Sequence, residues 1–253
     1  MTWYGSHFSY HGACDLVFLH NEKFANGLGL DIHIRTEHMM EKAYSFVSRA
    51  ALKIGNDILE VASNGAHFIN GKLGVPATLG GFPVTKSIKE TCRGSEDRRK
   101  CWFSLLFDVV LDNNDHILIK VASEMVHVDV VGNAKSFEGS VGVMGTFPAL
   151  HHGKIARDGV TFIMDPVNFT EEWQVRDDEP MLFQEARFPQ YPQSCTPAVS
   201  FPGAIRKLRE DEQKRLDVQE ACSHVTGPEW EFCVFDVTAT GDYGMAATIY
   251  GDD

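Results

Sequence analysis

The sequence predicts a mainly β protein, an antiparallel sandwich or barrel with a short helical tail near the C-terminus. Apolar and polar residues alternate along several short segments, as they do on strands with one buried face. Turn-forming dipeptides such as Asn-Gly separate these segments, which is typical of antiparallel folds rather than of alternating strands and helices. After residue 195 the pattern changes to a proline-containing stretch and then to a charged run. That change places the helical part at the end of the chain.

The first clear strand is LDIHIR, Leu30–Arg35. Its apolar residues share one face, and Asp31, His33 and Arg35 share the other, so we expect a half-buried strand whose polar face meets solvent. Further strands are predicted at Tyr44–Ile54, Asp57–Ala62, Cys101–Leu111, His116–Ala122 and Met125–Val131. The separators are Gly55–Asn56, Asn64–Gly65, Asn70–Gly71 and Asp112–Asp115. Between them, Gly80–Arg99 is less regular, and its charged end predicts an exposed loop.

The last part of the chain has a different composition. Thr196–Ala204 carries two prolines and a glycine and is typical of a linker. Ile205–Cys222 is charged, lacks Gly and Pro, and predicts a solvated helix that ends before Gly227–Pro228. We therefore divide the chain into a β domain, residues 1–195, and a linker with a helical module, residues 196–253.

Bulk properties exclude several classes of partner. The chain has 253 residues, of which 43% are hydrophobic, so it is long enough to bury a full core. Its net charge of -12 argues against nucleic acid and anionic membranes, because both require a basic surface. The sequence shows neither an apolar run of membrane-spanning length nor a charged-then-apolar leader.

The cysteines suggest the compartment. Their number, 6, is even, and Cys92 with Cys101 and Cys222 with Cys233 form two close pairs along the chain. Cys14 and Cys195 remain, far apart in the sequence. None has the spacing of a zinc or dithiol redox motif. A disulfide set formed in an oxidising compartment is the favoured interpretation, and six buried thiols in a cytosolic protein are the alternative.

Three motifs resemble the von Willebrand factor type D domain. The opening TWYGSHFSYHGACDLVF, Thr2–Phe18, follows that family's strand with alternating aromatics and its Gly-x-Cys motif. SVGVMGTF, Ser140–Phe147, resembles the family's Gly-Leu-Cys-Gly-Asn-Phe turn, although Met144 replaces the cysteine. FTEEWQV, Phe169–Val175, resembles its closing Phe-Gly-x-x-Trp-x-Val strand. The motifs span almost all of residues 2–195, and the remainder is similar to the start of the cysteine-rich module that often follows such domains.

The resemblance implies an antiparallel β-sandwich of the type D kind with a disulfide-stapled helical tail. It also implies a bond between Cys14 and Cys195. We then expect a secreted or cell-surface glycoprotein module, non-enzymatic, that acts structurally or in cell adhesion within the extracellular matrix by binding other proteins or glycans. Since the family's Gly-Asp-Pro-His segment is not found before Trp3, we further expect the chain to be a fragment of a larger protein.

Calcium is where this chain departs from the family pattern. Type D domains commonly bind Ca²⁺ through an opening Asp and through oxygens after the Gly-Asn-Phe turn, but those positions hold Tyr4 and Thr146 here. Asp158 is the nearby acidic candidate, whereas Ca²⁺ takes six to eight oxygen ligands. We therefore expect no cofactor, with Ca²⁺ as the one cation that the resemblance suggests. The Asp112–His116 segment, also rich in oxygens, is expected to be a plain turn.

An enzyme is the alternative function. The chain has 11 histidines, among them the adjacent His151 and His152, and a metal- or thiol-dependent enzyme would need these or a free cysteine. Solvent-facing strand histidines are the simpler interpretation of His7 and His11, and no phosphate-loop, Gly-x-Ser-x-Gly or His-Glu-x-x-His motif occurs. Asn168 begins an Asn-Phe-Thr glycosylation sequon, which carries meaning in a secreted chain.

Overall fold

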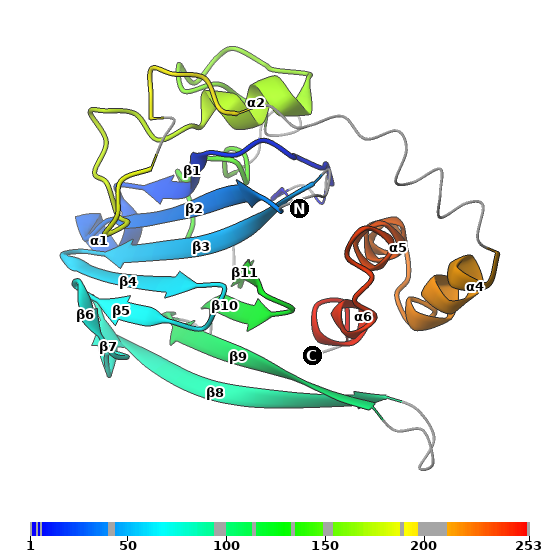
Figure 1. The fold of residues 1–253 in the computed structure, drawn as a ribbon. Coiled ribbons are helices and arrows are strands. Elements are labelled where there is room, and N and C mark those ends of the chain that lie inside the picture. Colours follow the sequence, from blue (N-terminus) through cyan, green and yellow to red (C-terminus); the bar gives the residue numbers. More distant parts are fainter. Residues whose placement is uncertain are drawn as a thin grey trace.

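The computed structural model describes residues 2–3, 5, 7–39, 44–93, 100–112, 115–132, 135–148, 154–187, 190–196 and 212–251, except the side chain of Glu212. In this part of the chain the strands form two antiparallel sheets (Figure 1). The six-stranded sheet has the order β1-β2-β3-β4-β5-β6, and the five-stranded sheet has the order β11-β10-β9-β8-β7. The prediction of a mainly β protein with antiparallel strands is confirmed.

The strands of the first sheet are β1 (Asp15–Asn21), β2 (Leu30–His38), β3 (Ser45–Ile54), β4 (Asp57–Ala62), β5 (His67–Ile69) and β6 (Lys72–Leu73). Those of the second are β7 (Thr78–Leu79), β8 (Phe82–Arg93), β9 (Lys100–Val110), β10 (His116–Ala122) and β11 (Met125–Val131). The helices are α1 (Phe24–Gly27), α2 (Pro166–Glu172), α4 (Glu212–Ala221), α5 (Glu229–Thr240) and α6 (Gly244–Thr248).

The predicted irregular segment from Gly80 onward is a long strand instead. β8 pairs with β9 residue by residue from Val84, opposite Val109, to Arg93, opposite Lys100. The side chains on both faces of β8 are exposed along most of its length. Apolar and polar residues therefore do not alternate clearly in this segment, and the sequence pattern does not mark it as a strand. Residues 94–99, the core of the predicted charged loop, lie outside the described residues.

The opening motif is not a strand either. Residues 7–12 have no regular structure, and β1 begins at Asp15, after Cys14 rather than before it. His7 and His11 lie against α5, where His7 stacks on Phe232 and His11 contacts Phe235, with ring centroids 5.3 Å and 5.5 Å apart. The prediction that these histidines face solvent on a strand is therefore wrong, because aromatic rings of the tail cover them.

Both sheets contribute to one hydrophobic core. The largest fully buried side chains come from each of them: Leu16, Leu30, Ile32, Leu52 and Leu59 from the first, and Phe107 and Ile117 from the second. Burying a side chain of this size contributes roughly 1.5–3 kcal/mol. The core therefore joins the two sheets into one unit.

The segment that resembles a closing strand forms helix α2. Asp165 caps the helix, since its carboxylate accepts a hydrogen bond from the Asn168 N–H at 2.8 Å, and Pro166 occupies the first turn, where proline is tolerated. Extended pairing begins only at Gln174, which forms a bridge to Leu16. The strand expected over Phe169–Val175 is wrong, because these local start signals favour a helix.

The Ser140–Phe147 turn docks on β1. Val141 forms a bridge to His20, and the Val143 N–H donates to the Val17 carbonyl at 3.0 Å. Gly142 has φ +136°, and a Cβ there would lie 2.5 Å from the Phe18 carbonyl oxygen, so only glycine lets the turn approach β1 this closely.

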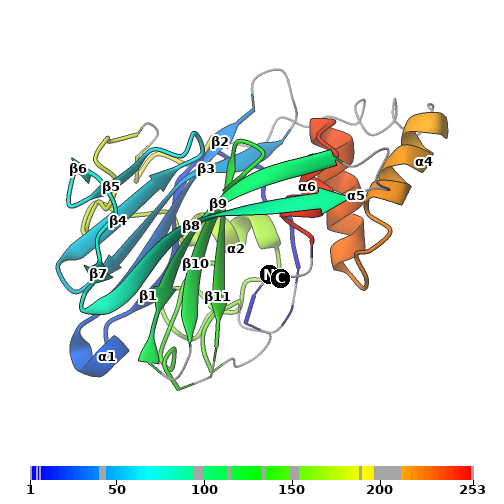
Figure 2. The same ribbon diagram turned by 90° about the horizontal axis from the view of Figure 1, so that it is seen from below.

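The helical tail packs beside the end of both sheets (Figure 2). α5 and α6 form a second hydrophobic cluster with residues of the sheets; its buried members include Val237, Met245, Tyr44 and Met125. The predicted helix is present as α4, although residues 205–211 of the prediction and most of the linker lie outside the described residues. No helix in the described part of the chain is long and apolar enough to cross a membrane.

Candidate functional site

The outer face of β2 is buried, although its pattern predicts a solvent-facing one. Asp31, His33 and Arg35 are only 7%, 2% and 4% exposed. Residues 154–187, which include α2, form a layer over this side of the first sheet (Figure 1). The prediction of a solvated polar face is wrong because this layer, distant in sequence, covers the face and accepts a hydrogen bond from Arg35. The neighbouring strands supply the countercharges, Asp15 to Arg35 and His20 and Lys53 to Asp31.

One anchor of the layer is Arg35. Its guanidinium donates two hydrogen bonds to the Asp15 carboxylate, at 2.7 and 2.8 Å, and a third to the Glu185 carbonyl at 2.8 Å. The guanidinium also lies 4.5 Å from the centroid of the Phe183 ring. A bidentate pair of this kind is charge-assisted and directional, so Arg35 fixes both β1 and the covering layer.

Arg157 holds the layer together from within. Its guanidinium forms an ion pair with Glu179, donates to the Gln174 carbonyl at 2.9 Å and lies 4.7 Å from the centroid of the Trp173 ring. Its Nε donates to the Glu172 carbonyl at 2.9 Å. One side chain thus ties the end of α2 to the following loop.

A third anchor is Glu60 in β4, which is 2% exposed. Its carboxylate accepts from Arg49 at 2.8 Å and from the Gln184 N–H at 3.0 Å. Beside it Leu182 and Phe183 pack on Ala51. Polar and apolar contacts therefore both hold residues 182–184 against the sheet.

His20 and Asp31 form a close pair beside the layer. His20 Nδ1 lies 2.5 Å from a carboxylate oxygen of Asp31, whose other oxygen accepts from Lys53 at 3.2 Å. The hydrogen bond to Asp31 raises the pKa of His20 above its ordinary value. This arrangement can hold a proton on His20, but the structure brings no nucleophilic side chain to it among the contacts described.

His33 has the opposite environment. Burial lowers its pKa from 6.5 to about 4, against the smaller opposing effect of nearby Asp31 and Glu179. Within the described residues its Nδ1 is buried and has no hydrogen-bond partner. The ring is therefore neutral near pH 7 and serves as part of the packing between the sheet and the layer.

A shallow cavity of about 220 Å³ opens where the layer meets β1. Its lining is rich in polar and charged side chains: Asp15, Gln174, Val175, Arg176, Asp177, Glu179, Met181 and Gln190. Asp15 and Glu179 already pair with Arg35 and Arg157. Two of the charged lining residues are therefore engaged in structural ion pairs.

The layer also exposes apolar side chains. Among the described residues, Val160 and Met164 are 80% and 79% exposed, and Phe162 and Val167 are more than two-fifths exposed. Ile163, which alternates with these residues, packs inward against a cluster that contains Phe169 and Trp173. We call Val160, Phe162, Met164 and Val167 the apolar edge.

The structure joins all six cysteines in three disulfides, Cys14–Cys195, Cys92–Cys101 and Cys222–Cys233. Cys14 and Cys195 are buried, and their bond ties the chain after the layer to the start of β1. No cysteine is left free in this arrangement, so it offers no thiolate for the Cys–His pair that the alternative enzyme would use.

Asp158 does not look like a calcium ligand. Its carboxylate accepts hydrogen bonds from the Val160 and Thr161 N–H groups, at 2.9 and 2.8 Å, and from the Thr161 hydroxyl. The hydrogen bonds from Thr161 lower its pKa. Its oxygens therefore close a turn, and among the described residues they do not fit the set of six to eight oxygens that Ca²⁺ takes. Tyr4 lies outside the described residues, as do His151 and His152.

The sequon lies in α2. The Asn168 side chain is exposed, whereas Thr170 is 1% exposed and donates its hydroxyl hydrogen bond to the Pro166 carbonyl at 2.8 Å. Glycosylation of Asn168 stays a prediction. In the folded chain the hydroxyl group of the sequon threonine is used in a hydrogen bond within α2.

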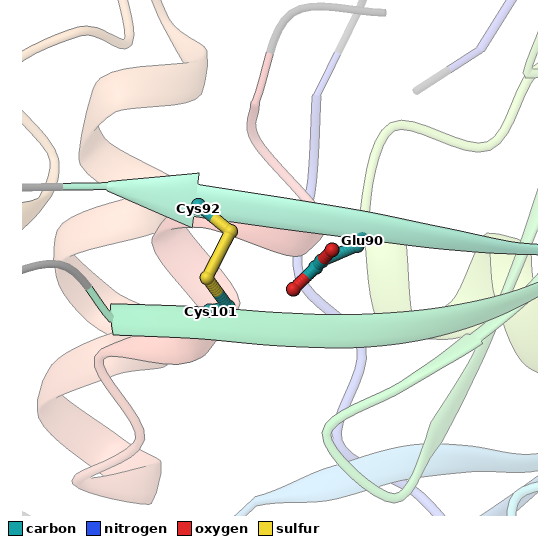
Figure 3. A group of neighbouring side chains, drawn as sticks. All are labelled: Glu90, Cys92 and Cys101. Atoms are coloured by element: carbon teal, nitrogen blue, oxygen red, sulfur yellow. A yellow bond between two sulfur atoms is a disulfide. The ribbon is translucent and has the colours of Figure 1, made fainter.

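Sequence reasoning missed two groups of residues. The first is the two ion pairs Asp15–Arg35 and Arg157–Glu179, of which only Arg35 lies in the alternating LDIHIR segment. The second is the group of Glu90, Cys92 and Cys101 (Figure 3). In the described part of the chain, this group brings three potential metal-ligand atoms within 4.8 Å of one another. Pairing of β8 with β9 creates it.

Comparison with protein-family models gives no match, and comparison with curated proteins gives none either. The resemblance to the type D domain therefore rests on the sequence motifs alone.

Proposed function

We propose that the chain is an extracellular, non-enzymatic interaction module, a β-sandwich of the von Willebrand factor type D kind. In this proposal residues 1–195 form the type D domain, and residues 196–253 form a linker with the start of a cysteine-rich helical module. The observation that carries the proposal is the ordered layer of residues 154–187, which presents the apolar edge while hydrogen bonds from Arg35 and to Glu60 hold it to the sheet.

Rigidity supports a binding role. A surface that is ordered before binding loses less conformational entropy when a partner docks. Arg157 holds the layer together, Arg35 holds it to the sheet, and Cys14–Cys195 ties the chain that follows it to the start of β1. These contacts leave Val160 and Met164 free to lie on a partner.

Charge and composition favour a protein or glycan partner in an oxidising compartment. The net charge of -12 disfavours nucleic acid. Three disulfides are typical of secreted and cell-surface proteins. Fold type, compartment and partner class together describe a structural or adhesive module of the extracellular matrix.

The test is secretion and matrix binding. We would express the full chain in an oxidising secretory host and measure its binding to arrays of purified extracellular-matrix proteins and glycans. The variant Val160→Ser/Met164→Ser should lose at least about tenfold in affinity for any ligand found, because it removes the most exposed apolar contacts. Leu73→Ser, at a side chain 76% exposed in β6, is the matched control and should bind as the parent does.

Two results would contradict the proposal. One is retention of the chain in the cell as a reduced protein. The other is equal binding by the apolar-edge variant and the Leu73→Ser control, which would place any binding elsewhere on the molecule.

A further inference from the structure

We propose that the Cys92–Cys101 disulfide masks a metal site, and that reduction frees both thiolates to bind Zn²⁺ together with Glu90. This inference concerns the ribbon of β8 and β9 and is independent of the proposed binding role of the apolar edge.

Strand pairing brings the three side chains together. Cys92 and Cys101 lie directly opposite each other in β8 and β9, with Cα atoms 4.0 Å apart. Glu90 is two residues before Cys92, so it lies on the same face of the strand. Figure 3 shows its carboxylate extending from β8 toward β9 beside the disulfide, and the ligand atoms lie within 4.8 Å of one another.

The same face of the ribbon is open to solvent. Cys101 and Glu90 are exposed and Cys92 is half-buried. Phe103, opposite Glu90, is 64% exposed. The other face is covered by the tail, where the Trp102 ring lies against Gly244 of α6. A metal ion can therefore reach the site from outside without any movement of the tail.

Exposure separates this disulfide from the other two. Cys14, Cys222 and Cys233 are each 0% exposed and Cys195 is 4% exposed, whereas Cys101 is exposed. Thiol–disulfide exchange requires access of the attacking thiolate to a sulfur atom, so an external dithiol should reach Cys101 first.

The chemistry balances with a dithiol as reductant. One thiolate of the dithiol attacks the Cys101 sulfur, the Cys92–Cys101 bond breaks, and Cys92 leaves as a thiolate. The second thiol of the reductant then displaces Cys101, so that the dithiol becomes a disulfide and both cysteines are reduced. Binding of Zn²⁺ removes any proton from each thiol and releases it to solvent.

The ligand set suits zinc. Thiolate sulfurs bind Zn²⁺ at about 2.3 Å and carboxylate oxygens at about 2.0–2.2 Å, so a tetrahedral ion needs its two sulfurs about 3.8 Å apart. Once the disulfide is reduced, rotation about the Cα–Cβ bonds of Cys92 and Cys101 can bring their sulfur atoms to that distance. Two thiolates and one carboxylate leave the fourth position to water, as in zinc sites with three protein ligands.

The first measurement is selective reduction of the full chain. We would titrate it with a trialkyl phosphine, which reduces a disulfide to two thiols and is itself oxidised to the phosphine oxide by taking the oxygen atom of one water molecule. The free thiols would then be alkylated, and mass spectrometry would identify the labelled cysteines. Label should appear at Cys92 and Cys101 before it appears at the other four cysteines. Earlier labelling of a buried pair would overturn the inference.

The second measurement is metal binding by the selectively reduced chain. Co²⁺ should give the sulfur-to-metal charge-transfer absorption of a thiolate site, and Zn²⁺ should displace it with one ion per chain. Glu90→Gln should weaken the apparent Zn²⁺ affinity by on the order of 10- to 100-fold. Glu231→Gln, at an exposed carboxylate of α5, is the control and should bind as the parent does. The inference fails if the reduced parent binds no more Zn²⁺ than Cys92→Ser/Cys101→Ser.

Discussion

Asp15 in β1 and Arg35 in β2 lie directly opposite each other and form a bidentate ion pair with hydrogen bonds of 2.7 and 2.8 Å. The pair is mostly buried, with side chains 17% and 5% exposed. Because Arg35 also donates to the Glu185 carbonyl, the pair connects the first two strands to the layer that covers them. Breaking the Asp15–Arg35 ion pair should therefore loosen the attachment of the layer to the sheet.

Asp15→Asn should destabilise the protein by about 3 kcal/mol, because it removes the negative charge opposite the buried Arg35 guanidinium and leaves one acceptor oxygen in place of two. Urea unfolding followed by fluorescence measures the change in the free energy of unfolding. Arg176→Gln is the control, since its pair with Glu172 is about one-third exposed and should contribute less than about 1 kcal/mol. Equal effects of the two substitutions would contradict a special role for Asp15.

The long disulfide should stabilise the chain most. Cys14–Cys195 spans 181 residues and Cys92–Cys101 spans 9, for which the chain-entropy model assigns roughly 5 and 2.7 kcal/mol. Non-reducing peptide mapping should find both bonds, and double replacement by Ala should lower the denaturation midpoint more for the first pair. A larger decrease for the Cys92–Cys101 pair would show that the disulfides do not constrain the unfolded chain as the chain-entropy model assumes.

Stability should fall on acidification through His33. Its pKa is about 4 in the folded protein against 6.5 ordinarily, so the unfolded state binds more protons between these values. The contribution, up to about 3 kcal/mol, is complete above pH 6.5 and is lost as the pH falls toward 4. His33→Gln should therefore flatten the stability profile in this window, measured by urea unfolding at successive pH values.

His20 provides the matched control of opposite sign. Its pKa is raised by the hydrogen bond to Asp31, so its contribution is present below pH 6.5 and is lost as the pH rises through the folded-state pKa. His20→Gln should lose most stability at low pH, where His33→Gln loses least. Identical profiles for both variants would mean that other groups dominate the pH dependence.

Val237→Asp should detach the helical tail from the sheets without unfolding them. Val237 is 0% exposed in the cluster that joins α5 to the sheets, and Val237→Asp places a carboxylate there. Hydrogen exchange should become fast in α5 and α6 and stay slow in β2, β3 and β10. Exposed Glu231→Gln is the control. Loss of protection throughout the chain would argue against the division at residue 195.

Local patterns in the sequence predicted much of the fold. Asp57–Ala62, His116–Ala122 and Met125–Val131 are strands with the predicted bounds, because turn residues stop them on both sides and alternation marks their buried face. Such signals lie within a few residues of each other. Tertiary contacts did not override them.

Where the signal was not local, the prediction was wrong or missing. LDIHIR shows that one face of β2 differs from the other, but not that both are buried, because the residues that neutralise Asp31 and Arg35 come from other segments. Glu90, Cys92 and Cys101 are close only through the register of β8 and β9.

By itself, then, the sequence determined the mainly β class, the bounds of β4, β10 and β11 and the presence of a helical tail, because propensity and alternation act over a few residues. The tertiary structure alone decided which polar residues are buried, what lies on β1 and β2, and which side chains meet across strands. Burial of the polar face of β2 depends on segments more than 100 residues apart, such as those of Arg35 and Glu185, and no local pattern records their approach.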